Sequence, residues 1–261
     1  MSTNTFLPIG LPTANPDPAF SQDGRAIVSL SSGQDIAQSV AVQSDGKIVL
    51  AGNVGAGTAN SDFALARYNT NGPLDPSFPG DGMLPAAPGP GSDVAQGVAI
   101  AADGKILIAG YSNFAATNED FVLLRFNADG SPDTGFGSTG KVITAISAGN
   151  IADQAHALAI QPDGKIVVVG NILYGPDFKV VRYNTDGTLD TTFGSGGIAS
   201  AAPDNNTAFA QAVALQSDGK ILVAGFAYHF DGTNFDGNVA LVRLNANGTL
   251  DTSFDGDGRV V

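Results

Sequence analysis

The sequence predicts an all-β fold, and its composition, its turn residues and an internal repeat all point to it. Of the 261 residues, 43% are hydrophobic and 14% are charged, which is enough apolar content for a sizeable core. The 25 acidic residues include one glutamate, Glu119. Aspartate favours turns and caps, whereas glutamate favours helix interiors. Together with 34 glycines and 14 prolines, this composition predicts many tight turns and little helix.

A repeat of about 58 residues organises the chain. A tetrapeptide ending in Asp-Gly-Lys recurs at 44–47, 102–105, 162–165 and 217–220. A longer string keeps the same phase and occupies residues 63–78, 121–136, 178–193 and 239–254. The tail of a further copy lies at Asp17–Phe20. We therefore expect an N-terminal extension over residues 1–16, followed by four complete units.

Each unit reads as four short strands. In the first unit they cover 25–30, 37–43, 47–52 and 63–68, and the first strand has copies at 83–87, 141–146 and 197–202. The third strand is apolar at nearly every position, so both of its faces should be buried. Asp-Gly joins the second strand to the third, which is a strong hairpin signal because glycine accepts a positive φ.

Repeated four-stranded sheets that are buried on both faces predict radial stacking, as in a β-propeller with one blade per repeat. We expect one domain over 17–261, with blades at about 17–74, 75–132, 133–189 and 190–250 and a terminal strand at 251–261. The segment 251–261 repeats the pattern of 17–30, and a closed four-bladed ring needs only one of them. Either the two share a blade, or the assembly is larger, as a dimer or a longer parent chain.

The motifs also resemble those of a known family. Asp-Gly-Lys-Ile, followed by Phe-x-x-x-Arg-Tyr/Phe-Asn-x-Asp/Asn-Gly-x-Leu-Asp-x-x-Phe, resembles the bacterial delta-60 repeat family of β-propellers over most of the chain. Departures are small: Leu244 stands where Tyr68 and Tyr183 stand, and Pro132 replaces a leucine. The resemblance implies a propeller and no assigned activity.

Charge and composition exclude several classes of function. A net charge of −13 counts against nucleic acid or an anionic membrane as partner. The absence of cysteine excludes disulfides, thiolate metal sites and cysteine nucleophiles. The first ten residues carry no basic residue and no long apolar run, so they do not read as a secretory signal. Localisation stays open between the cytoplasm and export by another route.

The loops predict where a ligand would bind. Because strands alternate in direction, the loops that vary between units fall together on one face, and variable loops on a repeat scaffold usually carry function. We expect that face to bind a carbohydrate or a protein, and the alternative is that its aromatic residues cover blade edges. The candidate ligand-binding residues are Tyr111, Phe114, Tyr174, Tyr228, His229, Phe230 and Asp236.

Three aspartates form a candidate metal site. Asp35, Asp93 and Asp153 start the second strand of three units, near the expected channel mouth. A ring of carboxylates could hold calcium, the one cofactor that the sequence suggests. The alternative is that each caps a turn. The Asn-x-Asp-Gly strings allow the same two interpretations, calcium ligands or Asx turns.

The two histidines define the catalytic alternative. His156 occupies a repeat position that is glutamine in the other units, and His229 lies in the longest loop. Paired with Asp153, Asp231 or Asp236, either could serve as the acid–base residue of a hydrolase or lyase. We favour a non-catalytic binding scaffold. A third reading is a structural repeat domain of a larger secreted protein, and a homo-oligomer is compatible with all three.

Overall fold

The computed structural model describes residues 16–56, 61–115, 118–148, 151–204, 206–230 and 235–261. Of the expected N-terminal extension, only residue 16 falls within these ranges. Within the strands, the side chains of 114–115, 118, 229–230 and 235 are also outside the description. Strands are the main regular structure of the described residues, which otherwise contain one short helical turn, α1 (Pro79–Gly82). No helix of the described chain is long and apolar enough to cross a membrane.

The strands form four antiparallel sheets of four, as the sequence predicts for a propeller. The first blade contains β1 (Gln34–Val42), β2 (Ile48–Ala56), β3 (Asp62–Tyr68) and β4 (Met83–Ala86). The second contains β5 (Asp93–Ile100), β6 (Ile106–Ala115), β7 (Asn118–Phe126) and β8 (Lys141–Thr144). The third contains β9 (Asp153–Ile160), β10 (Ile166–Ile172), β11 (Phe178–Tyr183) and β12 (Ile198–Ala201). The fourth contains β13 (Thr207–Leu215), β14 (Ile221–Phe230), β15 (Phe235–Leu244) and β16 (Arg259–Val260).

The blades are phased one strand later than the predicted units. The short strand β4, expected to open the second unit, instead pairs with β3 and closes the first sheet, with Leu65 opposite Leu84. The predicted blade boundaries at 74–75, 132–133 and 189–190 therefore fall inside sheets. A repeat fixes the spacing of its strands but carries no mark of where a unit begins, so only the pairing could decide the phase.

Turn chemistry explains the hairpins. Gly46, Gly104, Gly164 and Gly219 all have φ between 83° and 84°, a conformation that glycine adopts without a steric penalty. In each hairpin the aspartate side chain accepts a hydrogen bond from the backbone N–H two residues later, as Asp163 does from Lys165 at 3.1 Å. The Asp-Gly pair thus fixes the turn twice, through the glycine backbone and through the aspartate side chain.

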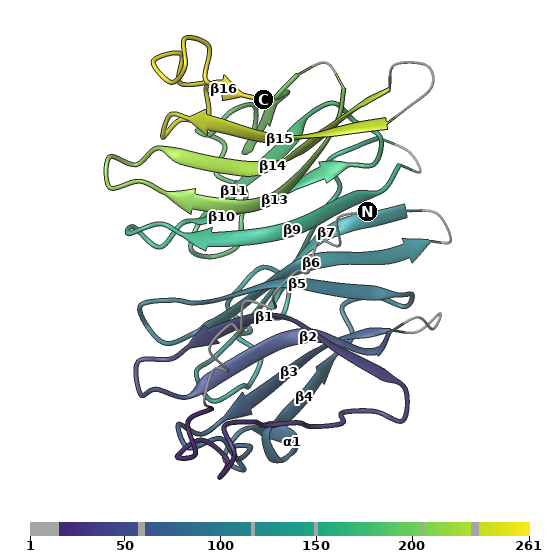
Figure 1. Ribbon diagram of the computed structural model, residues 1–261, viewed down its shortest axis with the longest axis vertical. Coiled ribbons are helices and arrows are strands. Elements are labelled where there is room, and N and C mark those ends of the chain that lie inside the picture. Colours follow the sequence, from purple (N-terminus) through teal and green to yellow (C-terminus); the bar gives the residue numbers. More distant parts are fainter. Residues whose placement is uncertain (1–15, 57–60, 116–117, 149–150, 205, 231–234) are drawn as a thin grey trace, which may run out of the picture.

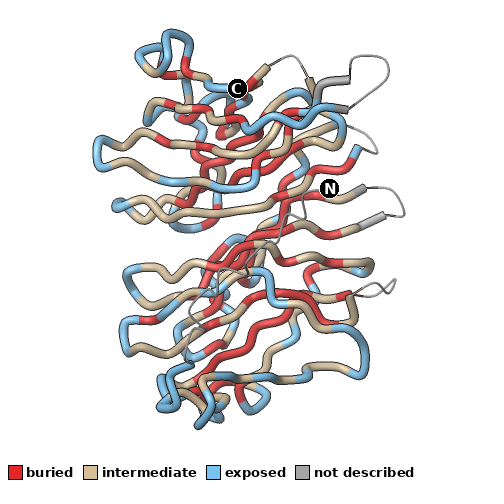
Figure 2. The backbone as a smooth tube through the Cα atoms, in the orientation of Figure 1, coloured by how far each residue is buried: buried red, intermediate tan, exposed pale blue. Residues whose placement is uncertain are grey.

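Three hydrophobic clusters lie between neighbouring blades. Blades one and two share a cluster that includes Phe63 and Ile108, blades two and three one that includes Phe121 and Val168, and blades three and four one that includes Phe178. The innermost strands β1, β5, β9 and β13 contact one another in this order. Figure 2 shows the buried residues concentrated in the strands, where blade faces blade.

A repeated arginine joins each blade to the next. Arg67 donates from Nε to Asp75 at 2.8 Å and from Nη1 to the carbonyl of Ala128 in the second blade at 2.5 Å. Its guanidinium carbon also lies 4.4 Å from the ring centre of Phe78. Arg125 and Arg182 repeat these three contacts toward blades three and four. Each of these arginines therefore forms an ion pair within its own blade and also bridges to the next blade.

We expect Phe136→Ala to cost about 3–5 kcal/mol of unfolding free energy, because it leaves a cavity under Arg125 between two blades. Phe136 is fully buried, and its ring lies against Gly187 of the next blade. The matched control is Phe254→Ala in the last blade, where the ring is only partly buried. Urea unfolding of both variants should give a much smaller loss for Phe254. Equal losses would show that blade-to-blade packing does not depend on this ring.

The four blades form an arc whose ends lie apart. In Figure 1 the first blade, in purple and blue, and the fourth, in green and yellow, lie at opposite ends of the long axis of the molecule. The described residues therefore show four propeller blades with two separate end faces.

Candidate functional site

The two kinds of loop lie on opposite sides of the arc. The Asp-Gly hairpins project to the left in Figure 1, whereas the opposite ends of strands β6, β7, β14 and β15 lie to the right. The right-hand side is the face on which the sequence places the variable loops. We call it the variable face.

A β-bulge re-aims one side chain per blade near the variable face. In the third blade Val169 pairs with Ala157 and Gly170 with Ala155, so His156 is the extra residue. The corresponding register shifts leave Gln38, Gln96 and Gln211 unpaired in the other blades. Bulges commonly redirect a side chain at functional sites. This explains why one repeat position carries a long polar side chain in every blade.

Glycine on the neighbouring strand makes room for the bulge. A Cβ on Gly170 would lie 1.9 Å from the carbonyl oxygen of Gln154, and the equivalent Gly52, Gly110 and Gly225 are equally crowded. No side chain fits at such a distance. The glycine of the recurrent Ala/Val-Gly, which ends the apolar run of each second strand, is therefore required opposite the bulge.

The bulge brings Tyr111 and His156 together. Their ring centres are 6.4 Å apart in an edge-on arrangement. His156 Nε2 lies 2.8 Å from Asn171 Oδ1 and donates to it, because an amide oxygen can only accept. Gln154 Nε2 donates to the carboxylate of Glu119 at 2.5 Å, and Tyr111 hydrogen-bonds with Gln96. We call Gln96, Tyr111, Glu119, Gln154, His156 and Asn171 the inter-blade cluster.

Electrostatics keep two members of this cluster neutral. Burial raises the pKa of Tyr111, and the nearby Glu119 carboxylate raises it further. Burial lowers the pKa of His156 despite its hydrogen bond to Asn171. Both rings are therefore uncharged at neutral pH. Asn171 is fully buried, and its Nδ2 has no hydrogen-bond partner among the described residues.

The cluster thus offers an aromatic ring, amides, one carboxylate and a neutral imidazole. These groups exchange hydrogen bonds well with hydroxyl groups. The predicted acid–base pair is not assembled in the described part of the chain, because His156 contacts an amide and Asp153 is bound to backbone. Asp153 accepts from the N–H groups of Ile146 and Ser147 at 2.7 and 2.8 Å.

The other predicted aromatic residues are separated. Tyr174 is 80% exposed in the turn between β10 and β11 and has a φ of 62°, which is uncommon for an aromatic residue and a pointer to function. Tyr228 lies on the outer face of the fourth blade, edge-on to Phe226 with ring centres 5.0 Å apart. It therefore belongs to an end face and not to the inter-blade cluster.

Several candidates lie outside the description. This applies to all of Asp231 and to the side chains of Phe114, His229 and Phe230. The backbone register places His229 opposite Asp236, which is exposed. These residues stay predictions.

The three aspartates of the predicted carboxylate ring each bind their own loop. Asp35 accepts from Ser31 Oγ at 2.6 Å and from the Leu30 N–H at 2.7 Å, and Asp93 accepts from Ser112 Oγ and from the Gly89 N–H. Burial raises the pKa of Asp93 to about 6, although Ser112 opposes the shift. Among the described residues, no three acidic or histidine side chains come close enough to hold a metal ion. The capping alternative describes these contacts, and calcium binding stays a prediction.

The Asn-x-Asp-Gly strings form Asx turns in the same way. Asp186 Oδ1 accepts from the Thr188 N–H at 2.9 Å and from its hydroxyl at 2.7 Å. Its oxygen atoms are thereby used within the turn.

Comparison with known proteins decides the family. The family described as "Domain of unknown function (DUF5122) beta-propeller" matches residues 43–78, 101–136, 161–193 and 216–254, more than half of the chain. The chain belongs to the DUF5122 β-propeller family. Each DUF5122 match begins near an Asp-Gly hairpin and ends at the phenylalanine beneath the repeated arginine, or at its counterpart in the last blade. No curated protein matches the chain.

Two solved structures are similar to this DUF5122 protein. One is a protein of unknown function from Bacteroides caccae, with 14% identity, a TM-score of 0.37 and coverage of 92% of this chain and 91% of that one. The other is an exo-beta-1,3-galactanase from Clostridium thermocellum, with 13% identity, a TM-score of 0.43 and coverage of 85% and 50%.

Sequence reasoning missed four members of the inter-blade cluster. Gln96, Glu119, Gln154 and Asn171 come from four different strands of two blades of this DUF5122 protein. One signal was available: Glu119 is the only glutamate in the chain. The bulge that turns His156 toward Asn171 has no signature of its own beyond the conserved spacing of the glycine on the next strand within the repeat.

Proposed function

We propose that this protein is a non-catalytic binding scaffold whose variable face holds a neutral carbohydrate at the inter-blade cluster. The observation that carries the proposal is the cluster itself. It combines a partly buried tyrosine with amides, one carboxylate and a neutral histidine. The repeat motif of the chain further supports the proposal that it belongs to the delta-60 type of bacterial repeats.

The chemistry favours a sugar over an anionic ligand. The net charge of −13 repels anions, and the neutral Tyr111 and His156 offer no fixed positive charge. A sugar presents hydroxyl groups to the amides and an apolar ring face to an aromatic side chain.

Screening an array of neutral oligosaccharides with the labelled protein tests the proposal. We expect binding that Tyr111→Ala weakens at least tenfold, since one hydrogen-bonded aromatic contact is worth about 1.4 kcal/mol or more. Tyr228→Ala is the matched control, because it removes a tyrosine from an end face. Unchanged binding by Tyr111→Ala, or equal losses in both variants, would contradict the assignment.

The same oligosaccharides separate the scaffold from the enzyme. We expect the bound sugars to be recovered intact. Hydrolysis or elimination that His156→Ala abolishes in a folded protein would favour the hydrolase or lyase alternative.

A further inference from the structure

The outer face of the fourth blade exposes repeat positions that are buried elsewhere. Val239 is 81% exposed, whereas its repeat equivalents Phe63, Phe121 and Phe178 are at most 1% exposed. Inside the arc, this position packs against the following blade. Its exposure here follows because no described blade covers the outer face of blade four.

The outer face of the first blade also exposes positions that are buried in another blade, in this case against the preceding blade. Val40 and Val42 are 61% and 63% exposed, whereas Val98, the equivalent of Val40, is 8% exposed and packs against the first blade. Each internal interface joins one face of the Val239 type to one face of the Val40 type. The two ends of the arc therefore present one face of each type, and the two are complementary.

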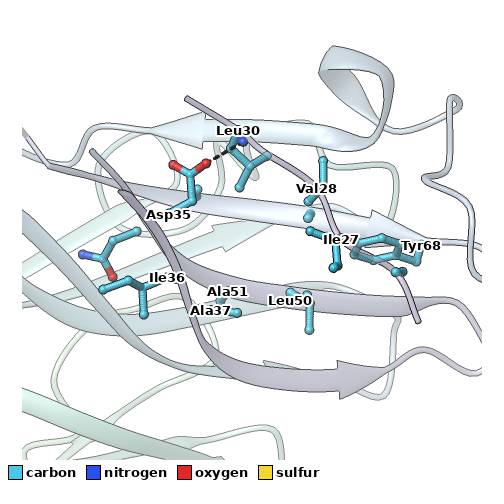
Figure 3. A pocket seen from close by; sticks show the side chains of 14 residues that line it. Ile27, Val28, Leu30, Asp35, Ile36, Ala37, Leu50, Ala51 and Tyr68 are labelled. Atoms are coloured by element: carbon cyan, nitrogen blue, oxygen red, sulfur yellow. Dashed lines mark hydrogen bonds between the residues drawn. The ribbon is translucent and has the colours of Figure 1, made fainter. Parts of the chain in front are cut away.

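Residues 25–30 lie across part of this first face and leave a cavity of about 220 Å³ between themselves and the blade. Figure 3 shows Val28 and Leu30 on one side of the cavity and Leu50 and Tyr68 on the other. Residues 25–30 repeat the pattern of β4, the outer strand of a blade. The cavity lies where the other strands of that blade would be.

The segment before residue 25 docks as the end of a preceding blade would. The Ser21 N–H donates to the carbonyl of Asn71 at 2.7 Å, as Gly137 donates to Asp186 at 2.8 Å and Gly194 to Asn247 at 2.9 Å between consecutive blades. The predicted strand at 25–30 is not formed in the single chain. The first blade thus carries in front of it a segment with the pattern of an outer strand, and the three strands that would pair with it are missing from the described residues.

The fourth blade, by contrast, has three full strands and a very short outer strand. Its outer strand β16 forms two residue pairs with β15, whereas β4, β8 and β12 each form four with their neighbours. Its arginine, Arg243, binds Asp251 and Ser253, but no described turn lies beyond it to take the contact that Arg67 makes with Ala128.

We propose that a second copy of this chain docks head to tail, with its fourth blade in front of the first blade of its neighbour. Strands β13–β15 of the incoming copy fill the space beside residues 25–30, which replace the two-residue β16 as the outer strand. The interface continues the one that already joins consecutive blades. It pairs Val239 of one copy with Val28 of the other, as Phe63 pairs with Ala86, and it brings Arg243 to the carbonyl of Thr70.

Light scattering after size-exclusion chromatography gives the first test. We expect a mass of at least two chains of 26.3 kDa, and a return to one chain in the Val239→Asp variant. Val239 is exposed in a single copy, so this variant should fold, and its circular dichroism should match the wild type. Ile143→Asp, at a 42% exposed position on the outer strand of the second blade, should leave the mass unchanged. A wild-type mass of one chain at the highest soluble concentration would overturn the proposal.

Cysteine pairing tests the register, because the chain contains no cysteine of its own. Opposed strand residues have Cα–Cα distances that allow a disulfide. We expect an equimolar mixture of Val28→Cys and Val239→Cys to form a mixed disulfide dimer on mild oxidation, whereas Ile143→Cys mixed with Val239→Cys should not. A mixture without the Val28–Val239 dimer would overturn the proposed pairing. In a chain that carries both Val28→Cys and Val239→Cys, a disulfide that forms only within one chain would overturn the proposal, because it would show that the arc closes on itself.

Discussion

Replacing Gly170 with alanine should lower the unfolding free energy of the protein by more than about 4 kcal/mol. Single substitutions rarely cost this much unless they create a conflict that the structure cannot relieve by a small shift. The added Cβ would lie 1.9 Å from the carbonyl oxygen of Gln154 and 2.7 Å from the ring of Phe121 in the preceding blade. Relief requires the bulge at His156 to move, and with it the contact between two blades. Chemical unfolding followed by circular dichroism would measure the loss.

Gly135→Ala is the matched control. A Cβ there would meet Asp133 at 3.5 Å, an ordinary contact, and its φ lies outside the left-handed region. We expect little change in its unfolding midpoint. If the Gly170 variant also unfolded within a few degrees of the wild type, the bulge would not be the constrained feature described above.

Asp190→Asn should cost on the order of 3 kcal/mol, because it leaves two cations without their carboxylate at a largely buried position. Asp190 accepts from Lys165 at 2.8 Å and from Arg182 at 2.7 Å, and it is 3% exposed. The same arginine reaches into the fourth blade, so the loss should loosen the junction between blades three and four. Thermal unfolding of this variant is compared with that of Asp186→Asn, which removes one negative charge at an exposed position. A lower midpoint in Asp190→Asn alone would assign the loss to the ion pair.

The pH dependence provides an internal check. Lys165 and the hydroxyl of Thr192 hold the pKa of Asp190 well below its ordinary value of 3.8. A lowered pKa stabilises the fold above about pH 4, and this contribution is lost as the pH falls toward the folded-state pKa. The difference in unfolding free energy between the wild type and Asp190→Asn should therefore become smaller below about pH 4. A difference that stays constant down to pH 2 would contradict the ionic origin of the effect.

The strands and hairpins were predictable because their signals are local. Asp163 and Gly164 specify a turn by their own side chain and φ, and the apolar run after Lys165 has the length of one buried strand.

The phase of the blades and the assembly of the site were not predictable from the sequence. The short strand at Met83 has the same pattern whether it opens one sheet or closes another, and only its hydrogen bonds to β3 decide. The inter-blade cluster depends on contacts across two repeats, such as that between Glu119 and Gln154. For Asp35, Asp93 and Asp153 the sequence left metal binding and turn capping open, because both uses place a carboxylate at the start of a strand. The structure shows each carboxylate bound by its own loop.

Hydrogen–deuterium exchange with the tightest oligosaccharide from the array tests the central claim, binding at the variable face, most directly. We expect added protection in residues 119–126 and 151–156, which carry Glu119, Gln154 and His156, with none in the hairpins at 101–105 and 161–165 on the opposite face. Protection at those hairpins, or no change anywhere on the variable face, would contradict the account.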